Sequence, residues 1–303
     1  MKKNKSFFIT AFNRDDILKN AIISLTKANK YDEYNKLIIY QDCTDEQKDM
    51  IYQIDPDIKI IKTSYSKNTP LYQKVSQNIY YGFQETFEKL NSSFSIHIED
   101  DILVTKNIFN FYEQILKTYS SDKSFFAVNG MSKELFDPKF ANNYSKFIWG
   151  ICKCWGIPKN RWLLLKKIWA DFYSLKKNIN QPHDGPIEIY IKKNIKYVIM
   201  PHQSLILEQL SNGLNSIEDP NYPGFKEWKN SFDSIKTHNE YIYNKNMPYS
   251  WRPDCIKYSV KNILTYKVYF FLKKYLPITI QKVLRKIQRS FKLLNKCKQF
   301  NKS

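Results

Sequence analysis

The stretch that organises this chain reads Phe94-Ser95-Ile96-His97-Ile98-Glu99-Asp100-Asp101-Ile102-Leu103-Val104. An apolar run rich in β-branched residues leads directly into acidic residues, and apolar residues resume at once. The pattern predicts a buried strand that carries a carboxylate cluster at its carboxyl end. Ligands of open α/β sheets bind at that edge.

The cluster of Glu99, Asp100 and Asp101 calls for a counter-charge. Carboxylates that lie beside apolar sequence repel one another and lose hydration, so a bound cation would stabilise them. Oxygen ligands suit Mg²⁺ or Mn²⁺, whose remaining ligands can be substrate phosphates. The alternative is a solvated acidic turn between a strand and a helix.

Length and composition set the class of protein. The 303 residues suffice for one large α/β domain or a domain with an appendage, and a hydrophobic content of 43% with 16% aromatics supports a packed core. Only 7 glycines are present, and no glycine-rich phosphate motif occurs. Five scattered cysteines, of which Cys152 and Cys154 lack a second pair for zinc, indicate reduced thiols in a cytosolic protein. The apolar run at residues 7–9 is too short for a signal peptide or a spanning helix.

Short apolar strands alternate with helical patterns along the first two thirds of the chain. Strands are predicted at residues 6–12, 37–40, 58–61, 94–98, 125–128 and 197–200. Helices are predicted around residues 17–25, 71–87, 108–116, 158–169 and 187–191, with Thr69 capping the second and Pro70 at its first position. The alternation predicts a largely parallel, Rossmann-like α/β sheet with helices on both faces.

Polar clusters directly follow three of these strands. They are Asn13-Arg14, Gln41-Asp42 and the acidic residues Glu99 to Asp101. In a parallel sheet all of them lie along one carboxyl edge, which could hold a base, a ribose and a metal-bound diphosphate in one groove.

Residues 6 to 216 resemble GT-A glycosyltransferases, especially the N-acetylglucosaminyltransferase I type and bacterial family 2-like sugar transferases. The resemblance is carried by Phe7 to Arg14, by Ile38 to Asp42, and by Ile98 to Ile102 before a helix rich in Phe and Tyr. Weaker downstream matches are Trp149-Gly150-Ile151 with Trp162, His183-Asp184, and Pro201-His202-Gln203-Ser204.

The resemblance implies a GT-A fold and a role for each residue of the edge. Asp101 matches the acidic residue that binds Mn²⁺ on the donor diphosphate. Asp42 matches the aspartate that reads uracil, and Arg14 matches the arginine near the nucleotide. Asn13, Glu99 and Asp100 complete the expected donor-binding residues, with Mn²⁺ or Mg²⁺ as the cofactor.

The catalytic base is the point at which this sequence departs from the family. The family has two adjacent aspartates where this chain has His183-Asp184-Gly185, so Asp184 is the first candidate and Glu188, one helical turn on, is its rival. Asp184 would also serve as a helix cap before Pro186. His202 matches histidines that bind the metal in some GT-A enzymes, but a lone histidine is more often structural. Trp149 and Trp155 could stack on a sugar, although core tryptophans are commoner.

The C-terminal segment differs in kind from the rest of the chain. Residues 261–303 hold twelve lysines and arginines and no acidic residue. An apolar helical stripe runs through them at Ile280, Leu284, Ile287, Phe291 and Leu294. A basic amphipathic helix suits an anionic membrane surface, although a helix packed on the core remains an alternative. Without these twelve charges the net charge of +19 falls to +7, so nucleic acid is not an expected partner.

These features predict a glycosyltransferase domain at residues 1–255, with a nucleotide-sugar half at about 1–130 and an acceptor half at about 131–255, followed by a membrane-surface segment at 256–303. The expected reaction moves a sugar from a UDP-sugar to a saccharide or lipid-linked acceptor, inverting with a carboxylate base, in envelope glycan synthesis. The expected location is cytoplasmic and peripheral on the inner face of the membrane. The alternatives are a sugar nucleotidyltransferase and a non-enzymatic basic protein that binds membranes or nucleic acid.

Overall fold

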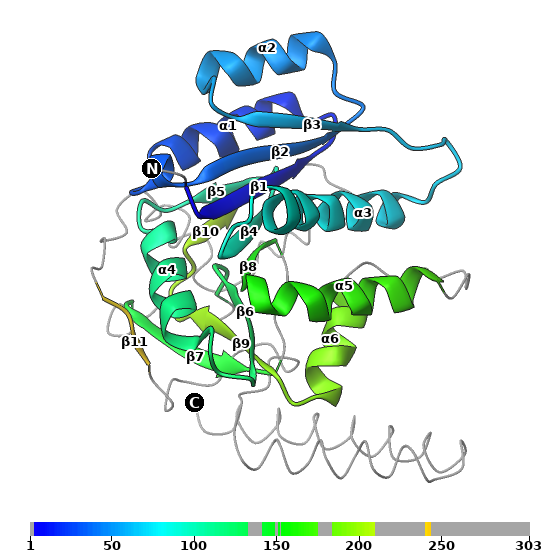
Figure 1. Cartoon of the computed structure of the whole chain (residues 1–303). Coiled ribbons are helices and arrows are strands. Elements are labelled where there is room, and N and C mark those ends of the chain that lie inside the picture. The colour runs from blue at the N-terminus through cyan, green and yellow to red at the C-terminus, as the bar shows by residue number, and fades with distance from the viewer. Residues whose placement is uncertain are drawn as a thin grey trace, which may run out of the picture.

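The computed structural model describes residues 3–132, 141–148, 151, 153–174, 184–209 and 240–243. The domain boundary predicted at residue 255 and the basic segment at 256–303 lie outside these residues. In the described part, a large mixed sheet runs through the molecule with helices packed against it (Figure 1).

The main sheet has nine strands in the order β11-β7-β9-β6-β8-β4-β1-β2-β3. Their bounds are β1 Lys5–Ala11, β2 Asn35–Gln41, β3 Lys59–Thr63, β4 Phe94–Glu99, β6 Phe125–Asn129, β7 Asn143–Phe147, β8 Cys154–Pro158, β9 Tyr197–Pro201 and β11 Ile242–Tyr243. Strands β1, β2, β3 and β4 are mutually parallel. A separate antiparallel pair joins β5 (Ile102–Val104) to β10 (Ile206–Glu208).

The strands predicted from apolar runs are present, and the sheet is mostly parallel as predicted. The prediction missed β8, which lies between β4 and β6 and is antiparallel to both. It also missed β7, which is antiparallel to β9. The acidic residues are followed by the short strand β5 rather than directly by a helix. These short strands are buried on both sides, so they lack the alternation that distinguishes a strand in sequence.

Helices cover both faces of the sheet, as predicted. Their bounds are α1 Asp15–Thr26, α2 Asp45–Ile54, α3 Leu71–Gln84, α4 Ile108–Tyr119, α5 Lys159–Ser174 and α6 Asp184–Lys193. Helices α1, α2 and α4 contribute to one hydrophobic cluster, whereas α3, α5 and α6 contribute to the other. The site-bearing strand β4 lies in the interior of the sheet, so its end is held by neighbours on both sides.

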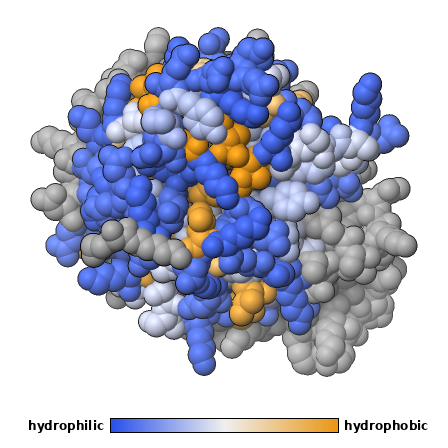
Figure 2. Space-filling model, turned by 45° about the horizontal axis from the view of Figure 1, so that its top comes forward, coloured by the Kyte–Doolittle hydropathy of each residue, from blue (hydrophilic) through white to orange (hydrophobic). Residues whose placement is uncertain are grey.

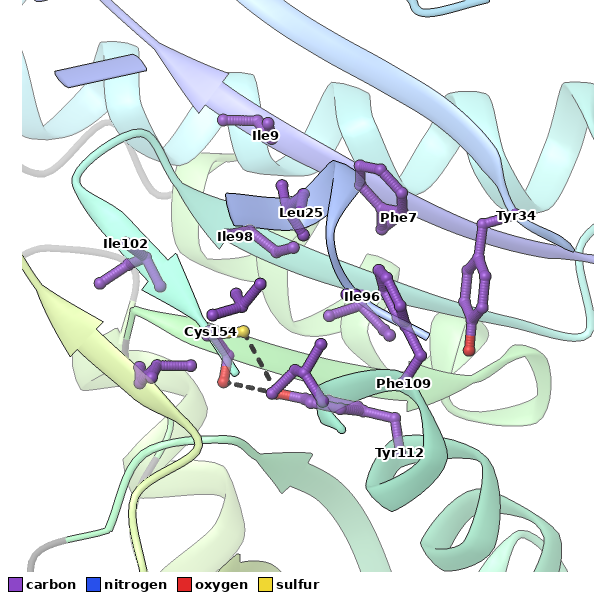
Figure 3. Close-up of a cluster of buried hydrophobic side chains, with 14 of the residues drawn as sticks. Phe7, Ile9, Leu25, Tyr34, Ile96, Ile98, Ile102, Phe109, Tyr112 and Cys154 are labelled. Carbon is purple, nitrogen blue, oxygen red and sulfur yellow. Dashed lines mark hydrogen bonds between the residues drawn. The ribbon is translucent and has the colours of Figure 1, made fainter. Parts of the chain in front are cut away.

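The hydrophobic cluster to which α1, α2 and α4 contribute includes large side chains of β1, β4 and α4 (Figure 3). The rings of Phe7 and Phe109 stack with centroids 5.5 Å apart, and Tyr34 lies 4.3 Å from Phe109. The Tyr112 hydroxyl donates to the carbonyl of Cys154 over 2.8 Å, which ties α4 to the missed strand β8. Each such fully buried apolar side chain stabilises the fold by about 1.5–3 kcal/mol.

Helix α3 differs in detail from its prediction. Pro70 rather than Thr69 occupies the cap position, and no side chain caps the helix. The predicted helix carries apolar residues at steps of four, and of these Leu71 and Val75 are 44% and 36% exposed, while Ile79 is fully buried. Steps of four residues advance about 40° around a helix of 3.6 residues per turn, so a long ridge cannot face the core throughout. Gly82 lets α3 approach β1, because a Cβ there would lie 2.2 Å from the Phe8 ring.

Hydrophilic residues cover most of the molecular face in Figure 2, with smaller hydrophobic areas between them. Within the residues that the structure describes, no helix has the length and apolar character needed to cross a membrane.

Candidate functional site

The pairing of β1 with β2 and β4 brings the three predicted polar clusters to one edge. Thr10 of β1 pairs with Glu99 of β4, and Ala11 of β1 pairs with Tyr40 of β2. The residues after β1 therefore lie between the acidic turn after β4 and the residues after β2. This juxtaposition was predicted from the sequence.

Two of the donor-binding candidates lie at tight backbone turns. Asn13 has φ 49° and Asp42 has φ 54°, and both side chains are exposed. Asn and Asp tolerate this left-handed conformation better than other non-glycine residues, which explains why these residue types can end the strands here. The Asp42 main-chain N–H donates to the carbonyl of Thr63 on β3 over 2.8 Å, which holds the turn against the next strand.

Arg14 clamps the acidic turn. Its Nε lies 3.3 Å from Oδ2 of Asp100, a terminal nitrogen pairs with Oδ1 of the same carboxylate, and the other lies 3.3 Å from Oδ2 of Asp101. The main-chain N–H of Phe12 also donates to Asp100, over 3.3 Å. Burial raises the pKa of Asp100 to about 6, although the Arg14 charge opposes that rise and Asp101 adds to it. Both oxygens of Asp100 are therefore engaged by the protein.

Lys153 is a second cation at the site, and the sequence did not predict it. It precedes β8 with φ 59°, and its ammonium lies 3.2 Å from Glu99, 3.0 Å from Glu208 and 3.7 Å from Asp101. Burial alone would lower the pKa of Lys153, but the carboxylates outweigh burial and raise it. The antiparallel β8 places Lys153 beside Glu99, and the return of β10 along β5 brings Glu208 there. Only these strand pairings, which sequence spacing does not reveal, could have identified the two residues.

Asp101 is the buried carboxylate of the acidic turn that keeps an oxygen without a donor from the described residues. The residue is 5% exposed, and its Oδ2 faces both Arg14 and Lys153. Its Oδ1 is buried and receives no hydrogen bond within the described part of the chain. Burial and the neighbouring Glu99 raise the pKa of Asp101, while Lys153 and Arg14 act against that rise.

The donor set fits a divalent cation that brings further ligands with it. Ionised Glu99, Asp100, Asp101 and Glu208 carry four negative charges against the two positive charges of Arg14 and Lys153, which leaves an excess of two. Across the described ranges, no group of three or more His, Cys, Asp or Glu is arranged to hold a metal ion unaided. A single carboxylate oxygen suits Mg²⁺-like ions when substrate phosphates and water complete the shell.

The other predicted site residues lie on different elements. Asp184 is the first residue of α6, at the start of the helix where a capping residue also lies. Glu188 lies further along α6 and pairs with Lys192, one turn beyond it. Among the described residues, no hydrogen bond or ion pair joins Glu188 to the network of Arg14 and Lys153.

His202 and Trp155 are both deeply buried. His202 follows β9 and is 1% exposed, and its main-chain N–H donates to Asn143 over 2.7 Å while its carbonyl accepts from Ser132. Trp155 is fully buried against Phe83, with ring centroids 4.9 Å apart, so it is a core residue and not a platform for a sugar. Trp149 lies outside the described residues.

No protein-family model and no curated protein sequence matches this chain. Among solved structures, a cytidylyltransferase from Leptospira borgpetersenii serovar Hardjo-bovis (strain JB197) matches with 8% identity and a TM-score of 0.35, over 55% of this chain and 64% of that one. Residues 1–349 of TarS from S. aureus match with 9% identity and a TM-score of 0.44, over 68% of this chain and 60% of that one. The chain thus spans less than two thirds of either structure.

Proposed function

We propose that this chain is a metal-dependent glycosyltransferase that moves a sugar from a UDP-sugar to a saccharide or lipid-linked acceptor. The observation that carries the proposal is the buried Oδ1 of Asp101, which receives no hydrogen bond from the described residues and lies at the carboxyl edge of parallel strands. An excess of two negative charges surrounds that atom, and the edge beside it carries Arg14 and the exposed Asp42.

The donor would lie along the ends of β1, β2 and β4. Asp42 is exposed beyond β2, where its carboxylate can accept the N–H of a uracil ring. Phe12 is 43% exposed beside it and offers a ring face to the base. Arg14 is fixed by Asp100, with its side chain 32% exposed, and adds positive charge where phosphates would bind. A divalent cation bound at Asp101 would offset the negative charge that develops on the leaving diphosphate.

The acceptor hydroxyl must lose a proton as its oxygen attacks the anomeric carbon. The bond that forms is the new glycosidic C–O bond, and the bond that breaks joins the sugar to the nucleoside diphosphate. A carboxylate oxygen takes the proton as general base. Because the displacement occurs in a single step, it inverts the configuration at the anomeric carbon. Asp184 is the preferred base because Glu188 is already engaged by Lys192. His202, buried directly after β9, would act as a further ligand of the metal.

A donor-hydrolysis screen tests the proposal. The purified chain is incubated with a panel of UDP-sugars, with and without Mn²⁺, and release of UDP is measured. We expect one donor to be hydrolysed slowly in a Mn²⁺-dependent way, and more rapidly when a suitable acceptor is added. Release of pyrophosphate from a nucleoside triphosphate and a sugar phosphate would instead identify a sugar nucleotidyltransferase. Lack of turnover with both substrate classes would favour a non-enzymatic role.

The location of the acceptor forms a second part of the proposal. Residues 261–303 carry twelve basic residues and no acidic one, which suits attachment to an anionic membrane surface. A lipid-linked acceptor would be presented at such a surface, and peripheral attachment on the inner face of the membrane would confine the enzyme to it.

A further inference from the structure

Lys153 lies at a point where carboxylates from three parts of the fold converge. Glu99 ends β4, Asp101 lies in the following turn, and Glu208 ends β10. All three contact the same ammonium group, over 3.2, 3.7 and 3.0 Å respectively. The Lys153 side chain is 22% exposed, and its backbone adopts the left-handed conformation with φ 59°. A non-glycine residue rarely adopts this conformation, which recurs at functional sites.

The two cationic side chains, Arg14 and Lys153, contact the same oxygen of Asp101. Arg14 and Lys153 both contact Oδ2, over 3.3 and 3.7 Å, whereas Oδ1 receives no donor among the described residues. Glu99 and Glu208 are meanwhile paired with Lys153. Among the described residues, Oδ1 of Asp101 is therefore the buried carboxylate oxygen of this turn that is left without a donor, although three carboxylates surround the ammonium.

We propose that Lys153 is a positioning residue that makes binding of a divalent cation depend on the nucleotide. This inference rests on the proposed function. The ammonium lies among three carboxylates that, as the described residues are arranged, do not form a metal site by themselves. It leaves the buried Oδ1 of Asp101 as the oxygen that the protein offers to a cation. A divalent cation must then obtain its other ligands from the donor diphosphate and from water, so metal and nucleotide bind together.

Removal of the ammonium should convert this arrangement into a direct cation site. The distances from Nζ to the carboxylate oxygens are 3.0 to 3.7 Å. Ligand distances to divalent cations are about 2.0–2.6 Å, so the carboxylates would need to move inward by about 1 Å. In a variant without the lysine charge, a divalent cation can take the place of the ammonium, and nucleotide is no longer required to complete its ligands.

Binding of Mn²⁺ tests the inference, with free Mn²⁺ measured by electron paramagnetic resonance. The wild-type chain is compared with Lys153→Met, Lys153→Gln and Lys153→Arg, each with and without UDP. We expect the wild type to bind Mn²⁺ weakly alone and more tightly with UDP. Lys153→Met and Lys153→Gln should bind Mn²⁺ alone at least about tenfold more tightly, because ligand charge sets the affinity of such sites. Lys153→Arg, which keeps the charge, should behave as the wild type does.

Lys166→Met is the matched control. It also removes a lysine from an ion pair, because Lys166 lies 2.9 Å from Glu88, but this pair is not part of the acidic turn. This variant should leave Mn²⁺ binding unchanged. Circular dichroism shows whether each variant is folded. If Lys153→Met does not fold, Lys153→Gln provides the test, because its amide can still donate hydrogen bonds to the carboxylates. Unchanged Mn²⁺ affinity in the folded neutral variants would overturn the inference and leave Lys153 as a structural ion pair.

The same data separate this inference from the proposed function. The gain in Mn²⁺ affinity is measured without nucleotide, so it depends only on the carboxylates around Lys153. Absence of any effect of UDP on Mn²⁺ binding by the wild type would contradict the proposed function and remove the coupling attributed to Lys153. If UDP strengthens Mn²⁺ binding by the wild type and by Lys153→Met to the same extent, the result would contradict the role of Lys153 and leave the proposed function intact.

Discussion

Two adjacent aspartates acquire different properties from their surroundings. Both oxygens of Asp100 are engaged, by Arg14 and by the Phe12 main chain, so this residue anchors the turn. Asp101 keeps Oδ1 without a donor among the described residues, so it is the residue that we propose as the cation ligand. The sequence shows only neighbouring carboxylates at a strand end. The different hydrogen bonding of the two aspartates becomes visible only from the positions of Arg14 and Lys153.

A comparison of Asp184→Asn with Glu188→Gln identifies the base. A base acts on the acceptor hydroxyl in the transition state, so its loss should lower kcat by about 10²–10⁴-fold and leave UDP affinity unchanged. We expect Asp184→Asn to show this pattern and Glu188→Gln to have a small effect, measured by steady-state kinetics and by UDP titration. If Glu188→Gln alone loses turnover, then the roles of the two residues are exchanged.

At the scale of the elements, Glu113 joins α4 to the start of the sheet. Its carboxylate accepts from Lys5 of β1 over 2.5 Å, from Lys30 over 2.6 Å, and from the Tyr34 hydroxyl over 3.1 Å. Burial alone would raise the pKa of Glu113, but the hydrogen bonds and charges of Lys30 and Lys5 outweigh burial and lower it. The cluster therefore favours the ionised carboxylate and supports the elements that carry β4 and its acidic turn.

Glu113→Gln should destabilise the fold in a pH-dependent way. A lowered pKa means that the native state binds this proton more weakly than the unfolded chain does, so the stabilisation is present above the unfolded pKa of about 4.3 and disappears as the pH falls through the folded pKa. We expect a loss of about 1–2 kcal/mol in the free energy of unfolding at pH 7. The difference from wild type should fade at acid pH in urea titrations.

Glu33→Gln serves as the control for this prediction. Glu33 also pairs with Lys5, over 2.7 Å, but its side chain is 52% exposed, so its loss should cost less than about 1 kcal/mol. Equal effects of the two substitutions, or an effect of Glu113→Gln that is independent of pH, would contradict the account of this cluster.

At the scale of the whole molecule, removal of residues 261–303 should abolish binding to anionic vesicles. Each basic residue near an anionic surface contributes about 1 kcal/mol, and salt screens that attraction. The truncated chain should keep activity on a small soluble acceptor and lose activity on a membrane-embedded one. Co-sedimentation with anionic and neutral vesicles at low and high salt measures the attachment.

Two outcomes would contradict that prediction. If the full-length chain remains in the supernatant with anionic vesicles at low salt, then the segment does not attach to membranes. An insoluble or unfolded truncation would instead assign residues 261–303 to closure of the core.

The sequence predicts the parallel half of the sheet because each strand there is a short apolar run that ends in polar residues. The positions of Arg14, Asp42 and Asp101 at a common edge follow from that pattern. The acidic turn could not be resolved further from the sequence, because Lys153 reaches it through the antiparallel strand β8 and Glu208 through the pairing of β10 with β5. Such pairings depend on tertiary packing, and residue spacing carries no record of them.

The central claim is that Asp101 holds a divalent cation on the diphosphate of a nucleotide. The most direct test is thermal unfolding of the wild-type chain and of Asp101→Asn, each alone, with Mn²⁺, with UDP, and with both. A neutral amide binds the cation poorly, so we expect UDP with Mn²⁺ to raise the Tm of the wild type and to leave the Tm of Asp101→Asn unchanged. An equal rise in Tm for both proteins would contradict the claim.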